Sequence, residues 1–259
     1  MIRSKLIKKI GYKLLDIFCK NGISVKINGF SLRLPVYYFR LFPSDYEKEN
    51  FEFIRRSIKE GHVVLDIGAH IGLTAAIFGN MVKEHGRVFS FEPTASSFAT
   101  LKETIRINGL QNIVTPVNMP VTEKSGKVNF FVSDSDTDVA NSLVEYEEHK
   151  ILHAIQLDAT SIDDFVSAQN LTRVDFVKID AEGAELNVLK GGAKTFATFK
   201  PLIILALHPE AINAIGHSLL SIYEVVKTMG FKIYFGSTEM SSDDFCNRQG
   251  LFDVHLTTQ

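Results

Sequence analysis

The chain alternates between short apolar runs and longer amphipathic segments over most of its length. From residue 62 onward, apolar runs are followed by turns and then by apolar positions at helical spacing. This order predicts parallel strands joined by helices that cover both faces of one sheet. The strands are expected at 62–67, 87–91, 113–118, 174–179 and 202–207, and the helices near 72–83, 95–108, 183–191 and 218–229.

Two further pairs of apolar segments modify this scheme. The runs at 231–235 and 251–256 are expected to close the sheet as a late antiparallel pair, with the polar segment 236–249 as a loop. The alternating segments at 127–132 and 153–157 predict strands around a polar loop. The predicted fold class is therefore α/β, with a doubly wound, mostly parallel sheet that ends in an antiparallel strand.

Residues 1–50 form a predicted extension in front of the main domain, which is expected at 51–259. Apolar residues recur at helical spacing among lysines in 3–20, which predicts a basic amphipathic helix. Segment 23–34 alternates on both sides of Asn28-Gly29, a pair that supplies the two positive φ values of a type I′ turn, so a β-hairpin is expected. A helix is expected at 46–60.

Composition and charge narrow the class of protein. Apolar residues make up 45% and charged residues 22% of the chain, which excludes a largely disordered or collagenous protein. Cys19 and Cys246 form no CxxC pair, so a disulfide framework and a cysteine zinc site are excluded and a reducing, cytoplasmic location is expected. No secretory signal peptide and no apolar run long enough to span a bilayer are recognised.

The net charge of −2 hides a strong asymmetry between the two ends. Residues 1–40 hold nine Lys and Arg against one Asp, while the remainder is acidic. An acidic main domain argues against nucleic acid as a partner. The basic helix can either pack on the domain or lie on an anionic membrane surface, so peripheral contact at the inner membrane face through residues 1–20 stays open.

A glycine turn at 63–74, VVLDIGAHIGLT, indicates a cofactor site. A strand runs into Asp66, Gly68 and Gly72, and Glu92 ends the next strand, where a carboxylate can accept hydrogen bonds from a ribose. Asp66 stands where a dinucleotide site carries its first glycine. Its charge would repel a pyrophosphate and suits an ammonium beside a sulfonium, which favours S-adenosylmethionine over NAD. There are two structural alternatives. The glycines could serve only the packing of the turn, and Glu92 could be the N-cap of the following helix.

A second polar stretch, VDFVKIDAEGAELNVLKGG at 174–192, indicates the reaction centre. Asp180 and Glu182 follow one predicted strand and His208 follows another, and the carboxyl ends of parallel strands share one crevice. These groups could act as a general base, orient a hydroxyl or hold a hard divalent cation. The alternatives are a purely structural role for the carboxylates and an ordinary loop position for His208. No set of metal ligands is assigned.

The stretches DIGAHIG, FEP at 91–93, KIDAEGAE and LKGG together resemble the FkbM-type family of S-adenosylmethionine-dependent methyltransferases, over about residues 50–235. The resemblance implies a Rossmann-like, seven-stranded fold. It also implies O-methylation of a hydroxyl on a small molecule, such as a sugar or glycan, a glycolipid or a natural product. The carried-over cofactor residues are Asp66, Gly68, Ala69, Gly72, Glu92, Asn118 and Asp180. His70, inside the glycine turn, is a further candidate on the cofactor side or a packing residue, and the catalytic candidates are Asp180, Glu182 and His208.

Two positions depart from the pattern of this family. Pro120 stands where Ala is usual on the adenine side, and Ala206 replaces a frequent Glu. The choice between Asp180 and His208 as the base stays open, as do the metal requirement and the oligomeric state. The rival functions are an NAD-dependent oxidoreductase, a non-catalytic binding protein of the same fold, and a methyltransferase with a nitrogen or protein acceptor.

Overall fold

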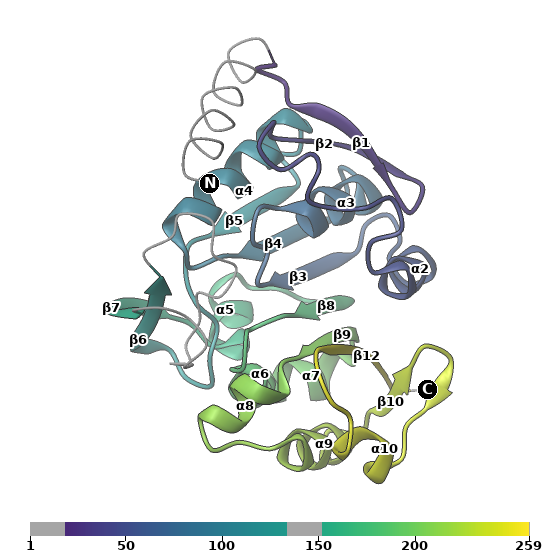
Figure 1. Ribbon diagram of the computed structural model, residues 1–259, viewed down its shortest axis with the longest axis vertical. Helices are drawn as coiled ribbons and strands as arrows, with labels where there is room; N and C mark the ends of the chain where they lie inside the picture. Colours follow the sequence, from purple (N-terminus) through teal and green to yellow (C-terminus); the bar gives the residue numbers. More distant parts are fainter. Residues whose placement is uncertain (1–18, 134–151, 259) are drawn as a thin grey trace, which may run out of the picture.

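A central sheet of eight strands organises the molecule (Figure 1), whose computed structural model describes residues 19–133 and 152–258. The strand order is β11-β10-β12-β9-β8-β3-β4-β5. Five neighbouring strands run parallel, namely β3 (Val63–Ile67), β4 (Arg87–Phe91), β5 (Val114–Val117), β8 (Phe176–Ile179) and β9 (Leu202–Leu207). The predicted α/β, doubly wound and mostly parallel sheet is thereby confirmed.

The late strands close the sheet in antiparallel fashion. Strand β12 (Phe252–Thr257) inserts between β9 and β10 (Lys232–Phe235) and is antiparallel to both. The short β11 (Thr238–Glu239) adds an eighth strand at the edge. The expectation of a loop over 236–249 is wrong, because β11 and helix α10 (Ser242–Cys246) lie within that segment.

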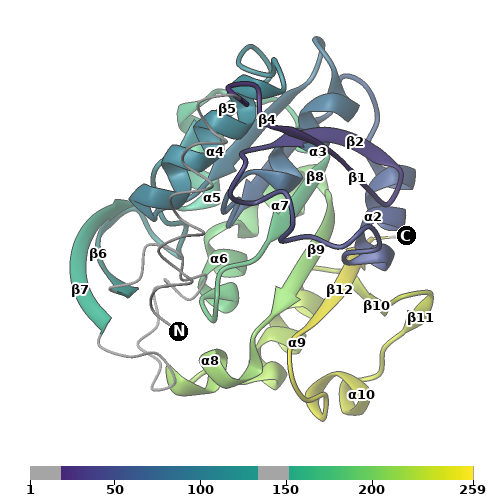
Figure 2. The ribbon, with the colours of Figure 1, turned by 45° about the horizontal axis from the view of Figure 1, so that its top comes forward.

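Helices cover both faces of the sheet, as Figure 2 shows from a second direction. The alternation along β3 explains why two layers form: Val63, Leu65 and Ile67 face one apolar core, and Val64 faces the other. The first core contains side chains of α5 (Ile162–Ala168), α6 (Glu185–Gly191), α7 (Ala193–Phe199) and α9 (Leu219–Thr228), and the second contains those of α2 (Lys48–Ser57), α3 (Leu73–Val82) and α4 (Ala95–Ile107). Helix α8 (Pro209–Ala214) follows β9.

The predicted N-terminal hairpin is present as β1 (Ile23–Ile27) and β2 (Phe30–Leu34), with Asn28 and Gly29 both at positive φ. Its buried side chains Ile27, Leu32 and Leu34 belong to the same apolar core as side chains of α3 and α4. The hairpin therefore packs on the main domain. The boundary at residue 50 stays a prediction.

Two other predicted segments have different outcomes. The strands expected around 127–132 and 153–157 form a separate antiparallel pair, β6 (Gly126–Ser133) and β7 (Leu152–Ala159), beside the main sheet (Figure 1). The basic helix predicted at 3–20 lies almost entirely outside the described residues. Within the described residues, no helix is both long and apolar enough to cross a membrane.

Candidate active site

A cavity of about 480 Å³ opens at the carboxyl ends of the parallel strands. This volume is in the range of sites for small molecules. Its lining comes from the ends of β3, β4, β8 and β9, from the start of β12, and from segments before α2 and after β5. The chain order reverses direction at β3, which pairs with β4 on one side and β8 on the other. Ligands of doubly wound sheets bind in the crevice at such a switch point.

The glycine turn and Glu92 form one half of this cavity. Gly68 and Ala69 donate their backbone N–H groups to the carbonyl of Phe91, which holds the turn against the end of β4. One carboxylate oxygen of Glu92 accepts the N–H of His70 at 2.9 Å, and the other accepts the N–H of Thr94 at 2.8 Å. Burial raises the pKa of Glu92 in spite of these bonds. Each oxygen keeps a second lone pair, so the carboxylate can still accept hydroxyl groups from the cavity.

Gly68 joins this half of the cavity to the other half. Its φ is +78°, and a Cβ at this position would lie 1.9 Å from the backbone carbonyl oxygen of Asp180. Only glycine permits both the left-handed backbone and this close approach. The turn after β3 and the segment after β8 therefore pack directly on each other.

Asp66 lies beneath the turn, outside the cavity. Its side chain is fully buried and accepts hydrogen bonds from the hydroxyls of Thr74 and Ser90. Strand register sets Ser90 and Lys178 directly beside Asp66 on the two neighbouring strands. Burial raises the pKa of Asp66 to about 6, although the charge of Lys178 opposes this shift. In the structure this carboxylate supports the turn from below, and its expected contact with a ligand ammonium stays a prediction.

The remaining predicted cofactor residues fall into two groups. His70 lines the cavity, and burial lowers the pKa of its imidazole. Ala69, Gly72 and Asn118 are absent from the lining. Gly72 faces Leu101 of α4, where a Cβ would lie 2.8 Å from the leucine side chain, and Asn118 donates to the carbonyls of Glu92 and Pro93. These residues shape the turn and the loop after β5 from outside.

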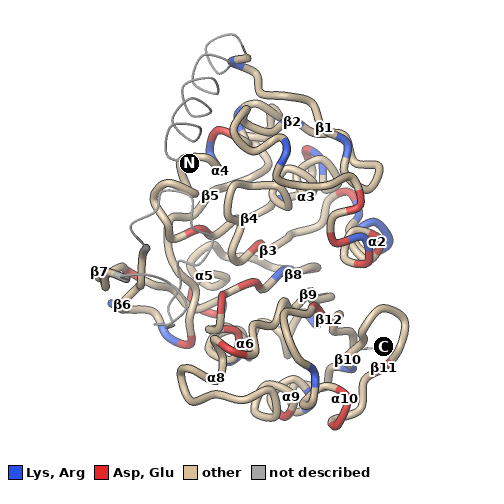
Figure 3. Tube along the Cα trace, viewed as in Figure 1, with Lys and Arg blue, Asp and Glu red and all other residues tan. Residues whose placement is uncertain are grey.

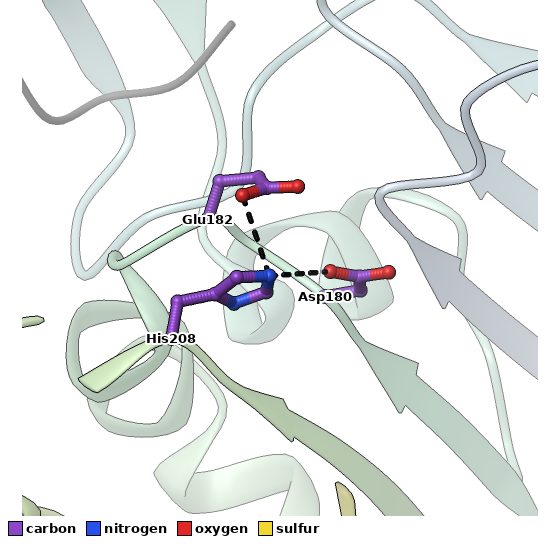
Figure 4. A group of neighbouring side chains, drawn as sticks. All are labelled: Asp180, Glu182 and His208. Carbon is purple, nitrogen blue, oxygen red and sulfur yellow. Dashed lines mark ion pairs between the residues drawn. The ribbon is translucent and has the colours of Figure 1, made fainter. Parts of the chain in front are cut away.

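Three predicted catalytic side chains meet in the other half of the cavity, at the acidic segment between β8 and α6 (Figure 3). Figure 4 shows Asp180, Glu182 and His208 around a common point. The Nε2 atom of His208 lies 3.6 Å from Asp180 Oδ1 and 3.3 Å from Glu182 Oε2. The other oxygen of Asp180 accepts a bond from the buried Lys178 Nζ at 2.9 Å.

Glu185 holds His208 from behind. Its wholly buried carboxylate lies 2.9 Å from His208 Nδ1 and also accepts the N–H of Gly183 at 2.9 Å. This contact fixes the ring so that Nε2 faces Asp180 and Glu182. The second oxygen of Glu185 has no hydrogen-bond partner in the described part of the chain.

The charges in the cluster shift one another's titration. Burial would lower the pKa of His208, but the bond to Glu185 and the charges of Glu182 and Asp180 raise it to about 9. Burial and the charges of Asp180 and Glu185 raise the pKa of Glu182 to about 7. Burial would raise the pKa of Asp180, but Lys178 and His208 hold it below its ordinary value. The charged neighbours therefore favour an ionised Asp180 and a protonated His208.

Sequence reasoning missed the wall opposite this cluster. Helix α2 starts at Lys48 rather than 46, so Tyr46 and Glu47 precede it and line the cavity. Asp253 faces them from β12, and burial raises its pKa to about 6. Asn50 connects the two elements, since its amide donates to Glu47 and to Asp253 and its oxygen lies 3.0 Å from His255 Nε2. The only local sign of this wall in the sequence was the pair of polar residues, Asp253 and His255, inside the apolar run 251–256.

Comparison with known families and proteins gives consistent matches. The model of the methyltransferase FkbM domain matches residues 66–233. The chain is 25% identical over 165 residues to 2-O-methyltransferase NoeI of Sinorhizobium fredii, a match covering 59% of this chain and 66% of NoeI, slightly under two thirds. It is 24% identical over 195 residues to the hexuronic acid methyltransferase AglP of Haloferax volcanii, covering 73% of this chain and 75% of AglP.

Solved structures share the fold. A structure from Clostridium thermocellum, described as an rRNA-methylase, superimposes with a TM-score of 0.50 at 13% identity. The superposition covers 82% of this chain and 94% of that protein. The Rossmann-like architecture predicted from the sequence is thereby confirmed.

Proposed function

The chain belongs to the FkbM methyltransferase family, and on this basis we propose that it transfers a methyl group from S-adenosylmethionine to a hydroxyl group of a sugar. S-adenosylmethionine is the cofactor of this methyltransferase class, and when bound it supplies an electrophilic methyl group on a sulfonium. The observation that carries the proposal is a single cavity with a glycine turn and a ribose-type carboxylate at one end and the Asp180–Glu182–His208 cluster at the other.

The residues around Gly68 fit the cofactor. The carboxylate of Glu92 borders the cavity with free lone pairs, which suits the two hydroxyls of a ribose. The backbone of Gly68 can approach a ligand closely because no side chain intervenes. His70 and Asp180 flank the turn and would enclose the methionine part.

The cluster would hold the acceptor hydroxyl next to the methyl group. Alignment of two reactants in one cavity can lower the barrier by roughly 7–11 kcal/mol, so orientation is the main contribution expected from the protein. Asp180, Glu182 and His208 offer hydrogen-bond acceptors to the hydroxyl, and Lys178 and Glu185 fix the geometry of Asp180 and His208.

The charge of the cavity favours a neutral or amino sugar as the acceptor. Glu47, Asp180, Glu182 and Asp253 line the acceptor half, and no Lys or Arg stands among the described lining residues. An acceptor with its own carboxylate would face like charges at close range. The acceptor proposed here therefore differs from the hexuronic acid in the name of AglP.

Two measurements test this function. Calorimetric titration with S-adenosylhomocysteine should give micromolar binding, and NAD should give none. Transfer of a radioactive methyl group should then occur to neutral or amino sugar glycosides and be at least tenfold slower to the matching uronic acids. Binding of NAD in place of S-adenosylhomocysteine would contradict the cofactor assignment, and preference for uronic acids would contradict the acceptor class.

We also propose that residues 1–20 bring the enzyme to an anionic membrane surface at the inner face of the membrane, where a lipid-linked sugar would be the acceptor. The support is the excess of Lys and Arg in the first 40 residues. The whole chain should float with vesicles that contain anionic lipid, and a chain lacking residues 1–20 should not. Equal flotation of both chains would contradict this role.

A further inference from the structure

Beyond the cofactor, the far half of the cavity has the features of a metal centre. We propose that Asp180, Glu182 and His208 bind one divalent cation, with Glu185 positioning the histidine from behind. Each of the three residues offers one ligand atom, and these atoms all lie within 4.8 Å of one another (Figure 4). The site deepens the proposed function, because the cation would lie where the acceptor hydroxyl is expected.

The distances fit a small cation. With metal–ligand bonds of about 2.1 Å, neighbouring ligand atoms lie roughly 3.0–3.4 Å apart in octahedral and tetrahedral sites. His208 Nε2 lies 3.3 Å from Glu182 Oε2 and 3.6 Å from Asp180 Oδ1. Small side-chain movements would therefore complete the coordination. Lys178 binds the other oxygen of Asp180, so it leaves Oδ1 directed at the cluster.

The carboxylate beside Nδ1 of His208 is an independent sign that this histidine is a metal ligand. Histidines that bind metals commonly donate their other N–H to a carboxylate, which fixes the tautomer and turns the free nitrogen toward the ion. Glu185 has this position at 2.9 Å from Nδ1. Glu185 is completely buried, and its second oxygen lacks a hydrogen-bond partner in the described residues. Burial of a carboxylate with an unpartnered oxygen is costly, and a cation bound beside His208 would offset this cost.

The local charge balance points to a dication. Three carboxylates, Asp180, Glu182 and Glu185, surround His208, and Lys178 pairs with Asp180. With His208 neutral, as a metal ligand must be, two negative charges are uncompensated, and one divalent cation neutralises them. The set of two carboxylates and one imidazole suits ions such as Mn²⁺ better than soft thiol-seeking ions.

The cation would explain how an acceptor hydroxyl becomes reactive. Three protein ligands leave open coordination positions toward the cavity, which one or two neighbouring sugar hydroxyls could fill. Binding to the cation lowers the pKa of a hydroxyl, and its proton can then leave to water. This role rests on the proposed function, whereas binding of the ion itself does not.

Electron paramagnetic resonance with Mn²⁺ tests the site directly on the whole chain after treatment with EDTA. We expect one Mn²⁺ bound per chain at micromolar concentration, at least tenfold weaker binding for Glu182→Gln and for Asp180→Asn, and about 10–100-fold weaker binding for Glu185→Gln. Glu60→Gln removes a carboxylate that pairs with Lys83 outside the cavity, and it should leave the affinity for Mn²⁺ unchanged.

Two results would overturn the proposal. One is no binding at millimolar Mn²⁺, and the other is equal binding by the parent chain, Glu182→Gln and Asp180→Asn. Titration with S-adenosylhomocysteine in the presence of EDTA separates failure of the metal site from failure of the proposed function. Glu92 and the glycine turn need no cation, so S-adenosylhomocysteine should still bind when the metal site fails. Denaturation curves of each variant show that the chain is folded.

Discussion

Replacement of Gly68 by alanine tests the contact that joins the two halves of the cavity. Two costs arise from the structure. The left-handed backbone at φ +78° costs an alanine about 1–2 kcal/mol. The new methyl group would also lie 1.9 Å from the carbonyl oxygen of Asp180, which is backbone and can move only with the segment after β8. Overpacking of this kind typically costs about 1–3 kcal/mol.

Gly61→Ala is the matched control. Gly61 has a nearly identical φ of +80°, and a Cβ there would meet no atom within 4 Å. This variant should therefore lose only the backbone contribution, about 1–2 kcal/mol, while Gly68→Ala should lose about 2–5 kcal/mol in total. Urea denaturation followed by circular dichroism gives both free energies of unfolding from one protocol.

The two variants should also differ in ligand binding. Gly68→Ala displaces the segment that carries Asp180, so the affinity for S-adenosylhomocysteine should fall at least tenfold, while Gly61→Ala should retain it. Gly68→Ala could instead be as stable as Gly61→Ala and bind S-adenosylhomocysteine equally well. This result would mean that the ends of β3 and β8 can move apart at no cost. The reasoning about their tight packing would then be refuted.

Three other predictions address single side chains. Glu92→Gln removes the charge that we propose accepts the ribose hydroxyls, so S-adenosylhomocysteine should bind about 10–150-fold more weakly by calorimetry, and unchanged affinity would remove Glu92 from the cofactor site. Thr74→Val deletes a hydroxyl that is hydrogen-bonded to the buried Asp66, and it should lower the free energy of unfolding by about 1–3 kcal/mol. The affinity for S-adenosylhomocysteine should change little. A large loss of this affinity in a stable variant would mean that Asp66 contacts the ligand. Burial raises the pKa of Asp253 to about 6, so this carboxylate binds a proton more readily in the folded chain than in the unfolded chain. As the pH falls from 7 to 4, the parent chain should therefore gain up to about 3 kcal/mol relative to Asp253→Asn, and a difference that does not vary with pH would contradict this.

Local sequence patterns predicted most of the fold because they reflect local physics. Apolar runs mark the parallel strands, and Asn28-Gly29 supplies the backbone angles of the hairpin turn. Helix α10 was missed although Ser241 caps it by accepting the N–H of Asp244, a spacing visible in the sequence. The short helices α5 and α7 were also missed, since each is only seven residues long and shows little periodicity.

The cavity was predicted in part, for a different reason. Asp180, Glu182 and His208 follow strands that a parallel sheet brings together, so topology alone indicated their proximity. The direction of Asp66 could have been predicted from β3, where it shares a face with Val64 rather than with Leu65 and Ile67. The wall formed by Tyr46 and Asp253 depends on contacts between distant segments, which no local pattern encodes.

The link from Asn50 to Asp253 and His255 has a consequence for how the enzyme matures during synthesis. The hydrogen-bonded partners are 203 and 205 residues apart, so the first side of the wall leaves the ribosome long before the second. At usual elongation rates this interval is about 10–40 s. Strand β9 ends at Leu207 and β12 begins at Phe252. For the last stretch of about 45 residues, roughly 2–9 s, β9 therefore lacks the strand that later separates it from β10, and its open edge can pair with other chains. The cavity wall that contains Asp253 is therefore completed only when β12 inserts, late in synthesis.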